Sequence, residues 1–125
     1  MHNLLVGWIG MAAGVLSGAA IGLFFHREKW LGGYSSFTRR MMRLGHIAFF
    51  GIGFLNSLFA FTIQESDPAE WIEYGAWGLA AANLLMPLVC FLSAWKKRFR
   101  HLFFLPVLAA SWGIVIAIVY VGGVR

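Results

Sequence analysis

Apolar residues fall into four long blocks, and shorter segments that hold most of the charged residues separate them. The blocks cover about 3–25, 44–63, 71–95 and 102–123. A helix rises about 1.5 Å per residue, so about 20 residues cross a hydrocarbon core of about 30 Å. The pattern predicts an all-α integral membrane protein, residues 1–125 forming a single domain of four transmembrane helices in a compact antiparallel bundle.

The composition agrees with this prediction. Hydrophobic residues make up 60% of the chain and charged residues 12%, whereas soluble domains carry about 25% charged residues. The first block has no basic residue before it and is longer than the apolar core of a secretory signal, so we expect it to be a retained transmembrane helix.

Cations gather at one side of the predicted helices. Nine of the ten Lys and Arg residues lie in segments 26–43 and 96–101, and the tenth is Arg125. The segment between the second and third blocks has no cation and carries Glu65, Asp67 and Glu70, and Glu73 follows at the start of the third block. By the positive-inside rule, loops 26–43 and 96–101 are cytoplasmic, and both termini lie on the outer, periplasmic side of a bacterial inner membrane.

The basic loops also explain the sequence pI of about 10.0. Each Lys or Arg near an anionic membrane surface contributes about 1 kcal/mol of attraction to the lipid head groups. No nucleic-acid-binding motif accompanies these cations. The expected partner is therefore the lipid bilayer and not a nucleic acid.

Small residues form lines along the predicted helices. In the first helix a glycine recurs at every fourth position: Gly10, Gly14, Gly18 and Gly22. Such spacing lets helix backbones approach closely in lipid, so it predicts a packing seam, with the lining of a cavity as the alternative. The third helix carries a similar line of helix-packing residues: Ala76, Ala80, Asn83 and Pro87. Pro87 also predicts a kink.

Three polar residues lie in the middle of the predicted spans: Asn56, Ser57 and Asn83. An amide in hydrocarbon needs a hydrogen-bond partner, so we expect Asn56 and Asn83 to pair across two helices. A hydrated path for an ion is the alternative interpretation.

Three histidines share a depth near the predicted cytoplasmic surface: His26, His46 and His101. Imidazole is a common haem ligand, and ligands on facing helices are typical of bundle sites. Gly53 lies seven residues after His46 on nearly the same helix face, where its missing side chain would leave room for a porphyrin. The arrangement suggests contact with a b-type haem, and the alternative is that these side chains only bridge apolar surface and head groups.

Other chemistry has little support in the sequence. Cys90 is the only cysteine, and no metal-binding or phosphate-binding motif is present. The central part of each predicted span contains no charged residue, which argues against a proton-coupled antiporter, a voltage sensor and a hydrolytic enzyme.

These observations favour a non-catalytic small integral membrane subunit or assembly partner of a larger bacterial inner-membrane complex. The shared depth of the histidines makes a respiratory or other electron-transfer complex the leading hypothesis, with other membrane subunits, or further copies of the chain itself, as partners. The alternative is a small homo-oligomeric channel or transporter for an ion or small solute, in which the glycine and asparagine faces line the path.

Overall fold

The computed structural model describes residues 2–64 and 68–123, so Glu65, Asp67 and Arg125 lie outside the described residues. Its four long helices are α1 (Asn3–Gly22), α2 (Phe37–Thr62), α3 (Glu70–Trp95) and α4 (Phe104–Val121). Two 3₁₀ helices, η1 (Trp30–Gly32) and η2 (Lys97–Phe103), lie in the connecting segments. Four segments are long and apolar enough to cross a membrane, the last combining η2 with α4. The prediction of a helical chain with four such segments is confirmed.

The helix boundaries differ most from the expected ones around the first loop. α2 begins at Phe37 rather than at residue 44, because the Ser36 hydroxyl caps it by accepting a hydrogen bond from the backbone N–H of Arg39 at 3.2 Å. α1 ends at Gly22, three residues earlier than expected. Gly32 and Gly33 have φ of 85° and 93° and form the turn between the two helices. Much of the expected loop 26–43 is therefore helical.

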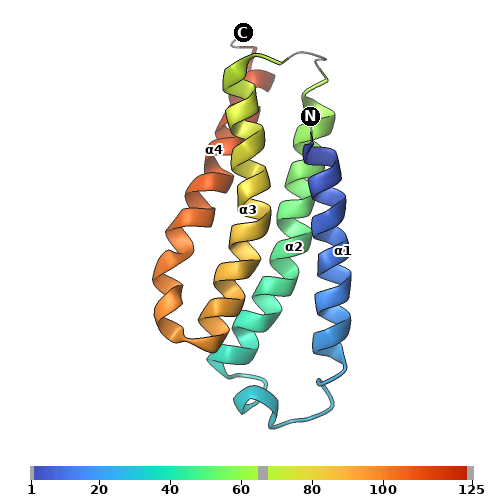
Figure 1. Ribbon diagram of the computed structural model, residues 1–125, viewed down its shortest axis with the longest axis vertical. Helices are drawn as coiled ribbons and strands as arrows, with labels where there is room; N and C mark the ends of the chain where they lie inside the picture. Colours follow the sequence, from blue (N-terminus) through green and yellow to red (C-terminus); the bar gives the residue numbers. More distant parts are fainter. Residues whose placement is uncertain (1, 65–67, 124–125) are drawn as a thin grey trace.

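The helices stand side by side in the order α1, α2, α3, α4, and each is antiparallel to the next (Figure 1). α1 also contacts α3 and α2 contacts α4, whereas α1 and α4, both fully described, do not touch. The expected compact bundle would close around one core. The structure instead has an open, staggered row, because α1 packs into the groove between α2 and α3 and does not reach α4.

Figure 1 shows the start of α1 and the end of α4 at one end of the row, which we call the terminal end. The two basic loops lie at the opposite end, which we call the basic end. The two inner helices, α2 and α3, are about twice as buried as α1 and α4. The main apolar core lies where α2, α3 and α4 meet toward the terminal end, and its buried members are Phe59, Ile63, Ile72, Ala76, Leu79 and Ile116.

Candidate functional site

A buried seam of asparagines joins α1, α2 and α3. The amide of Asn3 is completely buried and donates to Asn56 Oδ1 at 2.8 Å and to the carbonyl of Ala76 at 2.9 Å. Asn56, also completely buried, donates to the carbonyls of Ile52 at 3.0 Å and Leu79 at 2.9 Å. Two amide side chains thereby tie three helices together in a region where water cannot supply the bonds.

Asn83 bonds to α1 and not to Asn56, which corrects the pairing expected from the sequence. Its Nδ2 donates to the carbonyl of Val6 at 3.1 Å, and its amide lies against Gly10. The Val6 carbonyl is accessible because the residue one turn later, Gly10, has no side chain to cover it. Sequence reasoning missed Asn3 as the partner of Asn56 because Asn3 lies at the start of the first apolar block and not in its middle.

Glycines also leave room for side chains of α2 one and two turns further along α1, at Gly14 and Gly18. His46 Nδ1 lies 2.8 Å from the carbonyl of Gly14, and its ring packs on Gly18. A carbonyl can only accept, so Nδ1 carries the proton and donates. Phe50 fills the space beside Gly14 and meets the His46 ring edge-on, with centroids 5.6 Å apart.

Three of the four expected glycines thus lie in this seam: Gly10, Gly14 and Gly18. A Cβ on Gly22 would have no atom within 4 Å, so the seam ends before the last turn of α1. It extends instead in the other direction to Gly7, which the sequence reading missed. A Cβ on Gly7 would lie 2.6 Å from the carbonyl oxygen of Gly53, so the backbones of α1 and α2 touch here.

The small residues of α3 play different parts. Ala76 supplies a carbonyl to the asparagine seam and is buried, as are Asn83 and Pro87, whereas Ala80 is half-buried. α3 runs through Pro87 as one helix from Glu70 to Trp95.

The expected haem site does not fit this geometry. The space beside Gly53 is filled by α1, because a Cβ there would lie 2.9 Å from the Gly7 carbonyl and 3.1 Å from Cγ of Met11. The missing side chain of Gly53 therefore lets α1 approach and leaves no room for a porphyrin. The predicted span 44–63 put His46 in the first turn of its helix, whereas it lies about two and a half turns into α2. Its Nε2 also faces Gly18.

The other two histidines do not join His46. His26 and His101 are both exposed. Among the described residues, no group of three His, Cys, Asp or Glu side chains could hold a metal ion.

Three buried polar atoms of the seam have no hydrogen-bond partner: Asn3 Oδ1, Ser57 Oγ and Asn83 Oδ1. Such atoms could mark a hydrated path. Two of them, however, lie against glycines of α1, Ser57 Oγ at Gly7 and Asn83 Oδ1 at Gly10. The helices touch at these points, so the seam has no room for a hydrated ion there.

The basic end holds a second cluster, which the sequence reading missed. Arg39 is only 2% exposed, and its guanidinium donates to the carbonyls of Glu28 at 3.3 Å and Phe25 at 3.2 Å. Its Cζ also lies 4.8 Å, 5.6 Å and 5.7 Å from the ring centroids of Phe25, Trp30 and Tyr34. Arg39 therefore fastens the loop between α1 and α2 onto the start of α2. The signal in the sequence was the presence of three aromatic residues, Phe25, Trp30 and Tyr34, in the segment before Arg39.

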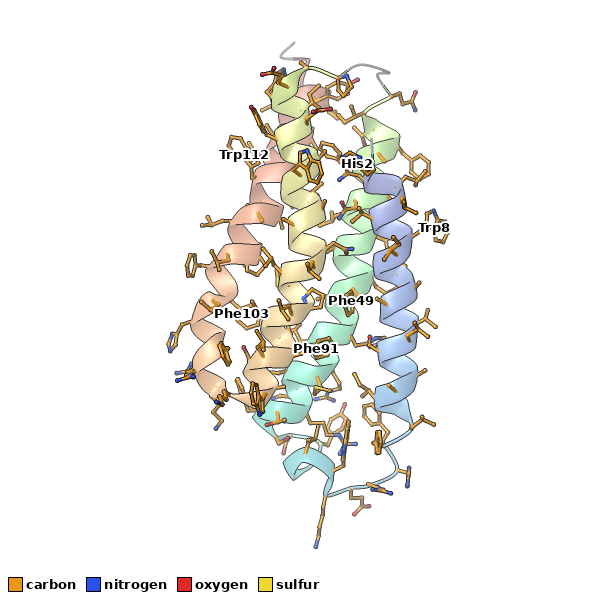
Figure 2. All side chains as sticks on the ribbon, viewed as in Figure 1. His2, Trp8, Phe49, Phe91, Phe103 and Trp112 are labelled. Carbon is orange, nitrogen blue, oxygen red and sulfur yellow. The ribbon has the colours of Figure 1, made fainter. Side chains whose placement is uncertain are left out.

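The outward surfaces of the row are apolar. A groove of about 510 Å³ runs between α2 and α4 over α3, and a second of about 350 Å³ lies between α1 and α2. Leu58 lines both grooves. Figure 2 shows Trp8 and Trp112 pointing away from the row at its two edges, and their side chains are 62% and 52% exposed.

Comparison with protein-family models, with curated protein sequences and with solved structures finds no match to this chain.

Proposed function

We propose that this protein is a non-catalytic membrane subunit that assembles side by side with other membrane subunits. The observation that carries the proposal is the contrast between the seam and the outer surface. The polar side chains of the seam are turned toward neighbouring helices of the same chain, whereas large apolar side chains cover both faces of the open row.

The inward use of polar groups argues against chemistry or transport by the chain alone. Asn3, Asn56, Asn83 and His46 each donate to a carbonyl or amide of another helix. A homo-oligomeric channel would need polar groups on an outward surface that faces the pore. The outward side of α2 carries Ile47, Phe54 and Leu58 instead, each more than half exposed.

The open row supplies the surface for assembly. Helices in lipid associate through close packing, because hydrocarbon is as favourable for apolar side chains as a protein neighbour is. The row has two grooves, and a partner helix can fill a groove more completely than disordered acyl chains can. The proposed location is the bacterial inner membrane, with the basic end in the cytoplasm and the terminal end outside, as the positive-inside rule implies.

The proposal does not depend on a haem. The hypothesis of a respiratory or electron-transfer complex came from the depth of three histidines, and His46 does not fit a haem in its present contacts. We therefore propose only the class of protein, a membrane assembly subunit. The purification described next would identify its complex.

The test is purification of the tagged full chain from its native host in mild detergent, with native mass spectrometry of what elutes. We expect a complex in which this chain and other membrane proteins occur in fixed stoichiometry. Leu58→Ala, in both grooves, should release the partners, whereas Leu84→Ala, which is 65% exposed on α3 and lines neither groove, should retain them. A homo-oligomer without partners, together with solute flux in proteoliposomes, would overturn the proposal in favour of a channel.

A further inference from the structure

The first two turns of α2 carry an unfavourable arrangement of charge. Arg43 lies three residues after Arg40 and four after Arg39, and all three are at the end of the helix where the backbone dipole is positive. The first turn of this helix contains no acidic residue. Like charges at this spacing repel one another, and the dipole adds to their cost, so a negative group at this position would relieve both.

The arginines are also held close together by one aromatic ring. The Cζ of Arg43 lies 4.0 Å from the ring centroid of Tyr34, and the Cζ of Arg39 lies 5.7 Å from it. Arg43 donates to the Tyr34 carbonyl at 3.2 Å. Arg39 has two carbonyl acceptors, and its buried Nε has no partner. The hydrogen bonds of both guanidiniums therefore go to neutral carbonyls, which leave their charge uncompensated.

The second basic loop reaches the same face of α2. Lys97 Nζ lies 5.5 Å from the ring centroid of Phe37, the first residue of α2. Phe37, Arg40 and Arg43 follow one another at intervals of three residues and so lie along one side of the helix. The side chain of Arg40 is exposed and makes none of the hydrogen bonds or ring contacts found in the described part of the chain. Arg40, Arg43 and Lys97 thus present cations along one strip.

Below this strip the same side of α2 becomes apolar. Leu44 and Ile47 lie one turn further along the helix from Arg40 and Arg43, and they are 43% and 59% exposed. A Cβ on Gly51, one more turn along, would have no atom within 4 Å, so the helix surface is hollow there. A ligand that fits this surface has an anionic group at one end and a hydrocarbon chain below it.

We propose that this strip binds the phosphate group of an anionic phospholipid, with the acyl chain lying along Leu44, Ile47 and Gly51. Guanidinium groups form charge-assisted, bidentate hydrogen bonds with phosphate. The exposed rings of Tyr34 and Trp95 set the strip at the depth of the lipid head groups. Inorganic phosphate offers the same head-group chemistry but makes no use of the apolar surface below.

The test compares two double variants that lose the same charge at the same end of the protein. Arg40→Gln/Arg43→Gln removes two cations of the strip, and Arg98→Gln/Arg100→Gln removes two exposed cations from the second basic loop. Binding of dioctanoyl phosphatidylglycerol to the purified chain in neutral detergent is measured by native mass spectrometry and by the shift in Tm. Dioctanoyl phosphatidylcholine and inorganic phosphate are the comparison ligands.

We expect the strip variant to bind phosphatidylglycerol about tenfold more weakly or worse, because each cation contributes about 1 kcal/mol. The control variant and the wild type should bind it alike, and both should prefer it to phosphatidylcholine. If the strip variant fails to fold, Arg40→Gln alone tests the proposal, because the Arg40 side chain makes no hydrogen bond or ring contact to a described residue.

Two results would overturn it. An equal loss in both double variants would mean that the membrane surface charge acts diffusely. Equal binding of inorganic phosphate would mean that the apolar part of the surface plays no role.

Discussion

Replacing Gly7 by alanine should push α1 and α2 apart. The added Cβ would lie 2.6 Å from the carbonyl oxygen of Gly53 and would also meet Ser57 Oγ. The carbonyl belongs to the backbone of α2, so only a shift of a whole helix can relieve the contact. Overpacking of this kind costs about 1–3 kcal/mol, and the higher helix propensity of alanine returns about 0.5–1 kcal/mol. We expect a net loss of stability between about 0 and 2.5 kcal/mol.

The matched control is Gly51→Ala on α2, where a Cβ meets nothing within 4 Å. This change should leave stability unaltered or raise it by up to about 1 kcal/mol, because only helix propensity differs. The free energy of unfolding is measured for both variants by titrating the protein from mild detergent into dodecyl sulfate and following helix content by circular dichroism. If Gly7→Ala is as stable as Gly51→Ala, the close approach of α1 and α2 is not a property of the protein.

A second pair of variants separates a backbone contact from a side-chain contact. At Gly10 the three atoms nearest to an added Cβ all belong to the amide of Asn83, at 2.5–2.9 Å. Asn83→Ala should therefore rescue Gly10→Ala, although it also loses a hydrogen bond to Val6, which in membrane proteins averages about 0.6 kcal/mol. Ser57→Ala should not rescue Gly7→Ala, because the carbonyl obstacle remains. A coupling energy of at least about 0.5 kcal/mol in the first cycle is expected, and its absence would contradict the seam geometry.

Three further predictions concern other parts of the chain. Asn56→Ala should cost about 1–3 kcal/mol in the same unfolding assay, because it removes one acceptor of the buried Asn3 amide and the bond to the Leu79 carbonyl, and an unchanged value would contradict the hydrogen-bonded seam. Arg39→Lys should lower the free energy needed to open the loop between α1 and α2 by about 1 kcal/mol, which raises the rate of tryptic cleavage in this loop by a factor of about five. The exposed Arg40→Lys should leave that rate unchanged. With an impermeant thiol reagent on intact cells, Gln64→Cys should be labelled and Glu28→Cys protected, and the reverse pattern would refute the proposed orientation.

The four spans could be predicted from the sequence because block length and hydropathy decide whether a segment crosses a membrane. The start of α2 could not. Arg39, Arg40 and Arg43 ended the apolar block, so the prediction placed the helix boundary after them. A helix can continue beyond the hydrocarbon when a side chain caps its first turn. Ser36 caps α2 in this way, and hydropathy does not record such a cap.

The polar contacts were predicted only in part, for a reason of geometry. The sequence identified Asn56 and Asn83 as amides that need partners, but the partner of each depends on how α1 rotates and slides against its neighbours. Gly10 makes the Val6 carbonyl available to Asn83, and Gly18 lies where the His46 ring must pack. The glycine spacing therefore predicted a seam, and only the structure reveals that polar side chains fill it. The close approach of α1 to α2, through the Gly7 carbonyl and Met11, removes the space that Gly53 was expected to leave for a haem.

The two outer helices are held in place by different kinds of interaction, hydrogen bonds for α1 and apolar packing for α4. This difference indicates where a partner would bind. α1 is fastened by amide and imidazole hydrogen bonds to specific carbonyls, which a lipid or a foreign helix could not replace. α4 packs on α3 through glycine contacts, Gly113 against Leu79 and Gly75 against Ile116. Such apolar contacts differ little in energy from contacts with another helix. A partner that fills the groove between α2 and α4 can therefore adjust α4 without breaking the seam, and partner contacts should concentrate on that side of the row.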